Sequence, residues 1–231
     1  MTILRHATIA SLVIFSATIA LSQAEQPRAS NSSSSDWRPL FDGRTLEGWE
    51  HVGPGKFVVE DGVLRTEDGM GLLWYAREKL GNCVIRVVYK TANVRSNSGV
   101  YLRIADKPKD AWYAVHHGFE IQVMDQSTSG RGTGSIYTFA KAAGIPPKSG
   151  EWNTLEITLK GNRITTAING VQAAEFDSSG LKPDAPEISG EGDPARGPRP
   201  ESGYIGLQNH DKNSIVYFKD VSVRPLPDSS K

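Results

Sequence analysis

The amino-acid sequence predicts an all-β protein, folded as a two-sheet antiparallel β-sandwich. Between residues 56 and 224, apolar side chains recur mostly at every second position, which is the period of a strand with one buried face. The 231 residues include 23 Gly and 13 Pro, and this content favours many turns over long helices. No stretch shows an equally persuasive helical period, and 71–81 is expected to hold at most a short turn of helix.

The expected strands follow one another with turn residues between them. The clearest cover 83–90, 98–104, 118–124, 154–160, 164–168, 171–176, 204–210 and 216–223. Gly161-Asn162 and Asn169-Gly170 suit the positive φ angles of tight hairpins, so 154–176 is expected to form three strands joined by two such turns. In the last strand the apolar positions change parity, and a bulge near Lys219-Asp220 would keep them all on one face.

Both ends of the chain are expected to lie outside the sandwich. Residues 1–24 have the basic start, uncharged apolar run and small terminal residues of a secretory signal peptide. Residues 25–36 form a Ser-rich segment with almost no apolar side chains, which predicts a flexible linker. The single domain then covers 37–224, with a Pro- and Gly-rich loop insertion at 178–202 and a tail at 225–231.

The N-terminal segment and the composition limit which partners and which cellular location are expected for this protein. A signal peptide predicts an exported protein, periplasmic or secreted, with no stable membrane insertion after cleavage; a retained membrane anchor is the alternative. The chain carries 26 Lys and Arg against 26 Asp and Glu, which argues against a nucleic-acid partner. Its single Cys excludes an intramolecular disulfide framework and a Cys-rich zinc site, and Cys83 is expected in the core. No protein partner is expected.

Three of the expected strands carry an unusual set of polar side chains opposite their apolar face. Amide, guanidinium, imidazole and phenol groups can grip sugar hydroxyls, while aromatic faces cover sugar C–H surfaces. The alternative is that these residues form the ordinary wet face of an antiparallel sheet. The residues are Tyr101 and Arg103 in the first strand, Glu120 and Gln122 in the second, and Tyr204, Gln208 and His210 in the third.

A second carboxylate lies close to Glu120 in the sequence. On a regular strand Asp125 would face the opposite way, but a bulge would bring it beside Glu120, and the two could then act as acid and base or as acid and nucleophile. The spacing resembles the E-x-D-x-x-E motif of laminarinase-like retaining glycosidases, with Gln122 at the middle position. Whether Glu120, Asp125 or His210 holds a divalent ion is left open, because no spacing in the sequence requires a metal site. His116-His117 is expected in a loop at the rim.

Six sequence blocks in order resemble the 3-keto-disaccharide hydrolase family, formerly a domain of unknown function. The resemblance runs from Trp37 to about Val223. It implies a concanavalin A-like jelly roll and action on glycosides oxidised at C3 of the sugar, and it maps polar family positions onto Asn97, Arg103, Glu120, Gln122, Asp125 and His210. Asp211 follows His210, where the family more often has Gly. The blocks are Trp37–Trp49, Asn97–Arg103, Gly118–Asp125, Thr133–Tyr137, Gly150–Asn153 with Asn169-Gly170, and Ile205–His210.

The resemblance leads to a hypothesis for the chemistry. A C3 ketone acidifies the C2 proton, so a base can remove it, the glycosidic oxygen leaves by elimination, and water adds afterwards. Glu120 or His210 is expected to be the base and Asp125 the other proton-transfer group. The groups expected to bind the small-molecule carbohydrate substrate are Asn97, Tyr101, Arg103, Gln122 and Gln208. A non-catalytic carbohydrate-binding module, a conventional retaining glycosidase and a structural cell-surface protein are the alternatives.

Overall fold

The computed structural model describes residues 36–126, 130–144, 146–182 and 197–227. The predicted signal peptide 1–24 lies outside the described residues, as do nearly all of the linker 25–36, the greater part of the insertion 178–202 and the end of the tail 225–231. None of the helices among the described residues could span a lipid bilayer.

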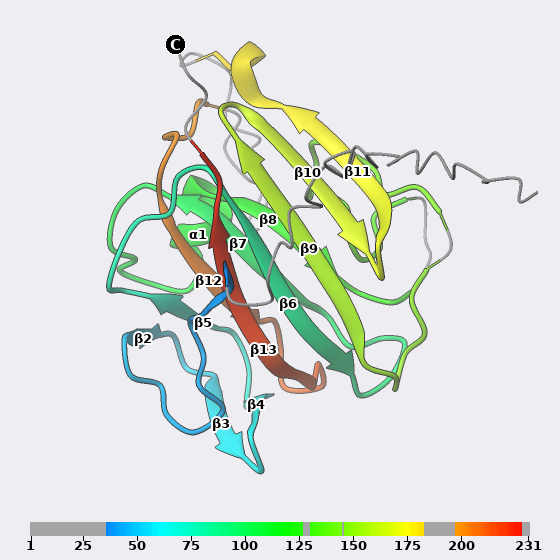
Figure 1. Ribbon diagram of the computed structural model, residues 1–231. Coiled ribbons are helices and arrows are strands. Elements are labelled where there is room, and N and C mark those ends of the chain that lie inside the picture. The colour runs from blue at the N-terminus through cyan, green and yellow to red at the C-terminus, as the bar shows by residue number, and fades with distance from the viewer. Residues whose placement is uncertain (1–35, 127–129, 145, 183–196, 228–231) are drawn as a thin grey trace, which may run out of the picture. The chain divides into compact units, whose positions relative to one another are not determined.

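The domain consists of two antiparallel sheets, so the predicted sandwich is confirmed (Figure 1). In spatial order, the larger sheet contains β11 (Val171–Asp177), β10 (Arg163–Ile168), β9 (Asn153–Lys160), β6 (Cys83–Thr91), β13 (Val216–Pro225), β4 (Val63–Glu67) and β3 (Lys56–Glu60), with the short β1 (Arg38–Pro39) also paired to β13. The smaller sheet contains β2 (Trp49–Val52), β5 (Gly71–Tyr75), β12 (Tyr204–Asn209), β7 (Ser98–Ile104) and β8 (Phe119–Val123).

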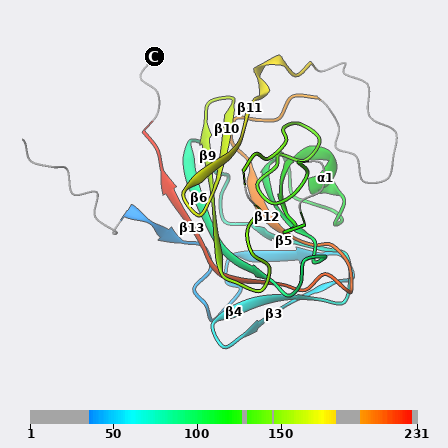
Figure 2. The same cartoon turned by 90° about the vertical axis from the view of Figure 1, so that its right-hand side faces the viewer.

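The hydrophobic core fills the space between the two sheets, which Figure 2 shows as two layers. Ile85 and Leu155 of the larger sheet and Val100 and Ile121 of the smaller sheet are fully buried in this one cluster. Because side chains alternate along a strand, the residues between them face away from the core. Cys83 is 2% exposed in the same cluster, as predicted, and its burial raises the pKa of the thiol to about 12.

The two hairpins and the bulge predicted from the sequence are present in the structure. Lys160 pairs with Arg163 across the first predicted hairpin, and Ile168 pairs with Val171 across the second. Asn169 and Gly170 there have φ angles of 50° and 82°, the left-handed conformation that a tight hairpin needs. The predicted bulge in β13 lies between Phe218 and Asp220.

Two elements differ from the expectation. Residues 71–75 form strand β5, because Leu73 packs into the main core while Leu72 and Trp74 pack into a second cluster on the opposite face. A strand buried on both faces loses the alternation that reveals it in a sequence. A short helix, α1 (Tyr113–His117), replaces the expected loop, and its Ala114 completes that second cluster. Helix α1 therefore covers part of the outer face of the smaller sheet (Figure 2).

Candidate active site

The polar side chains predicted on three strands come together on the outer face of the smaller sheet. Strand β7 lies between β12 and β8, an order that no sequence pattern reveals. Tyr101 of β7 pairs with Glu120 of β8 on one side and with Gly206 of β12 on the other. Gln122 pairs with Gly99 in the next row. Two adjacent rows of the sheet therefore place these side chains together.

Hydrogen bonds join the cluster around the Glu120 carboxyl. Gln208 Nε2 donates to Tyr101 Oη at 2.5 Å, and both side chains hydrogen-bond to Glu120. With its amide oriented to suit its neighbours, Gln122 Nε2 lies 3.0 Å from Glu120 Oε1 and 3.2 Å from the carbonyl oxygen of Ser98. Three planar groups thus hold one carboxyl in a defined position.

Gly99 makes room for this arrangement. A Cβ atom at position 99 would lie 2.6 Å from Glu120 Oε1 and 2.8 Å from Glu120 Cγ, well inside van der Waals contact. The Glu120 side chain therefore lies across the backbone of β7, where only glycine leaves the space.

The surroundings of Glu120 favour its neutral form. Glu120 is 9% exposed, and the neighbouring Tyr101 belongs to an apolar cluster with Leu72, Trp74 and Ile104. Burial raises the pKa of Glu120 to about 8, although the hydrogen bonds from Tyr101 and Gln208 act in the opposite direction. Burial, followed by the nearby Glu120 carboxyl, also raises the pKa of Tyr101 well above its ordinary value. At neutral pH the cluster thus holds a protonated carboxyl and a neutral phenol.

Two buried polar atoms of β5 and β12 on this face have no hydrogen-bond partner within the described residues. They are Trp74 Nε1, a donor, and Gln208 Oε1, an acceptor, on side chains that are 1% and 3% exposed. Trp74 pairs with Gly206 of β12, one row away from Gln208. A polyhydroxylated ligand offers both kinds of partner, since each hydroxyl donates and accepts.

Tyr137 is a site residue that the predictions did not include. The segment 133–137 adds to the free edge of β8, where the Tyr137 N–H donates to the Glu120 carbonyl oxygen at 2.8 Å. Ile136 is fully buried in the core, so alternation directs Tyr137 to the Glu120 face. Tyr137 is also among the groups that raise the pKa of Tyr101. The signal available in the sequence was its place in one of the resembling blocks.

His210 and Asn97 lie at the same end of the smaller sheet. His210 is exposed just beyond β12, and its Nδ1 is 2.8 Å from Asp211 Oδ2. That carboxylate also accepts from Ser214 Oγ at 2.8 Å, and Ser214 Oγ accepts from the Asn97 N–H at 3.0 Å. Burial alone would raise the pKa of Asp211, but hydrogen bonds from His210, the Asn213 N–H and Ser214 hold it below the ordinary value. Asp211 is therefore an anion that fixes the His210 ring through Nδ1 and leaves Nε2 for a ligand.

The expected bulge that would bring Asp125 beside Glu120 is wrong. Alternation continues past the end of β8, so Asp125 follows Ile121 and Val123 toward the larger sheet. Its carboxylate accepts from Thr91 Oγ1 at 2.6 Å, from Thr133 Oγ1 at 2.8 Å and from Tyr89 Oη at 3.2 Å. Asp125 is 5% exposed and is held by hydroxyl groups on the inner side of the sheet.

The expected direction of Arg103 is also wrong. The pairing of β7 with β12 shifts between Tyr204 and Gly206, and Arg103 there has a φ angle of 53°. This irregularity turns Ile104 to the outer face and sends Arg103 inward, where its guanidinium donates to the Gly161 carbonyl oxygen. Arg103 is fully buried, and this burial lowers its pKa.

The described residues contain no group of three His, Cys, Asp or Glu side chains that could hold a metal ion. Glu120 and Asp125 face opposite sides of the smaller sheet, and His210 lies beyond the end of β12. The three residues considered as ligands of a divalent ion therefore do not form a ligand set.

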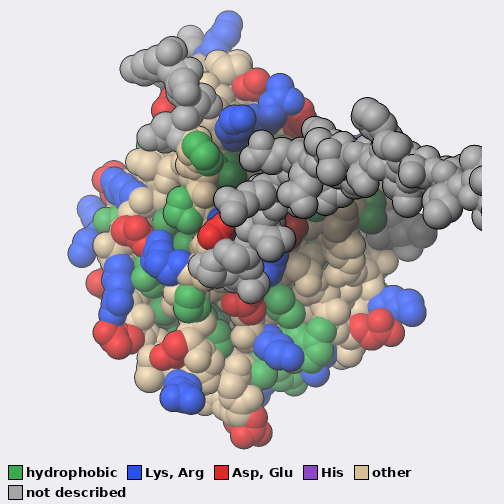
Figure 3. Space-filling model, in the orientation of Figure 1, with side chains coloured by type: hydrophobic (Ala, Val, Ile, Leu, Met, Phe, Trp, Pro, Cys, Tyr) green, Lys and Arg blue, Asp and Glu red, His purple; other side chains and the backbone are tan. Residues whose placement is uncertain are grey.

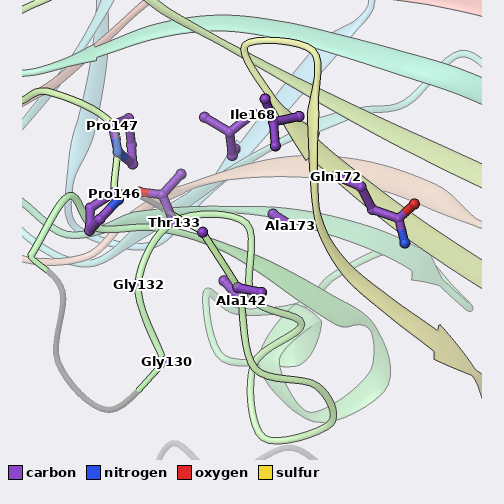
Figure 4. A pocket seen from close by; sticks show the side chains of 12 residues that line it. Gly130, Gly132, Thr133, Ala142, Pro146, Pro147, Ile168, Gln172 and Ala173 are labelled. Carbon is purple, nitrogen blue, oxygen red and sulfur yellow. The ribbon is translucent and has the colours of Figure 1, made fainter.

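A separate hollow lies beside the β10–β11 hairpin (Figure 4). It is a shallow cavity of about 60 Å³, and Gly, Ala and Pro residues line most of it. Its polar side chains are those of Thr133 and Gln172, and Thr133 is already bonded to Asp125. The hollow lacks an acid or a base, so the polar cluster around Glu120 remains the candidate active site.

Solved structures share this fold. A protein from Parabacteroides distasonis ATCC 8503 with a proposed glycosyl hydrolase activity is 27% identical, with a TM-score of 0.66 over 82% of this chain and 99% of its own. A second such protein from the same organism is 21% identical, with a TM-score of 0.67 over 83% and 94%. A Bacillus subtilis protein of unknown function with a galectin-like fold is 13% identical, with a TM-score of 0.60 over 84% and 96%. A comparison with curated proteins found no relative.

One family model matches nearly the whole described domain. It is the 3-keto-alpha-glucoside-1,2-lyase-like domain, and it covers residues 36–224. This match and the likeness to glycosyl hydrolase-like structures support a carbohydrate-active enzyme with a small sugar substrate. The chain belongs to the family of 3-keto-alpha-glucoside-1,2-lyase-like domains.

Proposed function

We propose that the protein is an exported enzyme that cleaves the glycosidic bond of 3-keto-glycosides, including 3-keto-disaccharides, by elimination followed by hydration. Family membership supports the substrate class. The observation that carries the proposal is the buried Glu120 carboxyl, whose pKa of about 8 keeps it protonated at neutral pH beside the neutral phenol of Tyr101.

The reaction needs one group that accepts a proton and one that donates a proton. The base takes the C2 proton, and the C–H electron pair becomes the C1=C2 double bond conjugated with the C3 ketone. The C1–O bond breaks, and its electron pair goes to the leaving oxygen, which receives a proton from the acid. Water then adds across the double bond, with its oxygen at C1 and a proton at C2, so the net result is hydrolysis.

His210 suits the role of the base. Asp211 holds Nδ1 at 2.8 Å, which fixes the ring and favours the tautomer with its lone pair on Nε2. The carboxylate also stabilises the imidazolium that forms when Nε2 takes the proton. In this chain the position after His210 supplies the orienting group, where the family more often has glycine.

Glu120 suits the role of the proton donor. A neutral carboxyl in an apolar site can donate to an oxygen that gains negative charge, either the enolate oxygen or the leaving oxygen. Gln208 hydrogen-bonds to Glu120, and His210 lies two residues beyond Gln208, about 7 Å further along the chain. A sugar ring can span that separation. Tyr101, Tyr137, Gln122 and Gln208 would then hold hydroxyl groups of the substrate, and Asn97 lies at the rim.

Asp125 and Arg103 have no part in this mechanism because both face the inner side of the sheet. Their placement also argues against a conventional retaining glycosidase, which needs a second carboxyl about 5 Å from the first on the same face. A carbohydrate-binding module without catalysis is distinguished by experiment, since it would bind a sugar and release nothing.

The test is turnover of a 3-keto-glucoside by the purified protein and its variants. His210→Ala and Glu120→Gln should each lower kcat/KM by about 10²- to 10⁴-fold, the usual contribution of a general acid or base. His51→Ala, which removes an exposed histidine on β2, is the matched control and should keep full activity. Unchanged turnover in both site variants would refute the assignment.

The proposal that the protein is exported rests on residues 1–24 alone. N-terminal sequencing of the protein recovered from the producing cells should find Glu25 as the first residue of the mature chain. An uncleaved chain in the cytoplasm would contradict this part of the proposal.

A further inference from the structure

The outer face of the larger sheet carries a second row of residues suited to a sugar. Lys90 of β6 pairs with Tyr217 of β13, which pairs with Arg65 of β4. Trp152 immediately precedes β9 on the other side of Lys90. The row crosses four adjacent strands and is about 14 Å long. Figure 3 views this side of the molecule and shows Lys and Arg side chains interleaved with hydrophobic ones.

A hollow of about 210 Å³ opens along this row. Trp152 is 39% exposed, one of four large hydrophobic side chains of the described residues that solvent reaches to this extent. The Lys90 ammonium lies 4.9 Å from the ring centroid of Trp152 and 4.9 Å from that of Tyr217. A second ammonium, that of Lys219, lies 5.7 Å from the Trp152 ring. Two aromatic rings and the Lys90 ammonium thus line one hollow, and the Lys219 ammonium lies against the Trp152 ring at its edge.

These two lysines differ from three arginines on the same sheet. Arg86 is paired with Glu156 at 2.9 Å, Arg163 is paired with Glu175, and Arg65 is paired with Glu67 at 2.5 Å. Within the described residues, neither Lys90 nor Lys219 has a carboxylate within ion-pair distance. The Trp152 side of the hollow therefore has positive charge that the protein does not neutralise by direct pairing.

The other side of the hollow is acidic. Glu60 and Asp61 line it at the turn between β3 and β4, where Glu60 also lies 3.4 Å from Arg65. Carboxylates accept hydrogen bonds from hydroxyl groups. The hollow therefore offers cations for an anionic group, aromatic faces for C–H surface, and acceptors for hydroxyl groups, arranged from one side to the other.

We propose that this hollow is a second, non-catalytic carbohydrate site that binds uronic acid residues of an anionic polysaccharide. The uronate carboxylate contacts Lys90 and Lys219, the sugar ring packs on the exposed parts of Trp152 and Tyr217, and its hydroxyls donate to Glu60 and Asp61. The site lies on the sheet opposite to Glu120, so it is independent of the elimination chemistry. It would hold the enzyme on a polymeric matrix while the active site faces away.

Affinity electrophoresis and calorimetry with polygalacturonate test the proposal on the full mature chain. Wild type should bind polygalacturonate, and added salt should weaken binding because the two ammonium groups are near the surface. Trp152→Ala and the double variant Lys90→Gln/Lys219→Gln should each raise Kd at least about fivefold, the effect expected of a central binding residue. Turnover of a small 3-keto-glucoside should stay unchanged in both, which separates this site from the catalytic one.

Matched controls distinguish the site from general surface effects. Trp112→Ala removes another exposed tryptophan, which is 46% exposed, and Lys109→Gln/Lys141→Gln removes two exposed lysines elsewhere. Both controls should bind like wild type, and circular dichroism should show every variant folded. Absence of binding, equal binding of neutral amylose, or equal weakening by the control variants would each overturn the proposal. Binding that Glu120→Gln abolishes and Trp152→Ala spares would overturn it as well.

Discussion

Replacing Glu120 by glutamine should change how the stability of the domain depends on pH. In the wild type the carboxyl is buried, and its pKa rises from the ordinary 4.5 to about 8 on folding. Glutamine has nearly the same shape and cannot ionise, so it imitates the protonated form at every pH. The variant tests whether burial of this one group opposes folding at neutral and basic pH.

The sign and the size follow from proton linkage. Below pH 4.5 the carboxyl is protonated in both the folded and the unfolded chain, so its contribution does not change with pH. Between pH 4.5 and about 8 only the folded chain holds the proton, and the free energy of unfolding falls by about 1.4 kcal/mol per pH unit. Over the whole window this amounts to roughly 5 kcal/mol, lost as pH rises through the folded pKa.

Urea unfolding of both proteins between pH 5 and pH 9 measures the effect. The stability of Glu120→Gln relative to wild type should rise steadily up to about pH 8 and then level off. Glu50→Gln replaces an exposed glutamate on β2 and should follow the wild-type curve. Parallel curves for wild type and Glu120→Gln across the range would refute the raised pKa, and with it the assignment of Glu120 as the proton donor.

Three further changes test the arrangement of the site. Gly99→Ala places a methyl group 2.6 Å from the Glu120 carboxyl, so it should lower the free energy of unfolding in urea by about 1–3 kcal/mol and should also lower turnover. Gly180→Ala meets nothing within 4 Å and should change neither quantity. Arg199→Ala removes donors at 3.0 and 3.1 Å to two carbonyls at the end of α1, so hydrogen exchange should speed up in α1; unchanged exchange would contradict this anchoring. Asp211→Asn should lower turnover less than loss of the imidazole does, and wild-type turnover would contradict its orienting role.

Much of the fold can be predicted from local patterns. The strands of 154–176 alternate cleanly and are joined by turns whose glycines adopt positive φ, so local preference and final structure agree. Glu120 and Gln122 face away from the core because Phe119, Ile121 and Val123 face toward it. A period of two determines which residues share a face, but it does not tell which strands become neighbours.

The errors share a physical origin. Arg103 and Ile104 exchange faces at an irregularity between β7 and β12, and such a shift depends on the partner strand. Asp125 keeps the regular alternation where a bulge was expected, because hydroxyl groups of Tyr89 and Thr91 on the other sheet satisfy its carboxylate. Tyr137 joins the site through an added edge segment that has too few residues to show a period.

Local sequence patterns were enough to predict the sandwich, the turns and the chemical types of the site residues, since strand alternation and turn conformations depend on neighbours along the chain. The place of β7 between β12 and β8 follows from the pairing of distant segments, and so does the enclosure of Glu120 by Tyr101, Gln122 and Gln208. Burial, which shifts the pKa of Glu120, comes from residues distant in sequence that the smaller sheet and α1 bring together. The reactivity of that carboxyl is therefore a property of the packing around it.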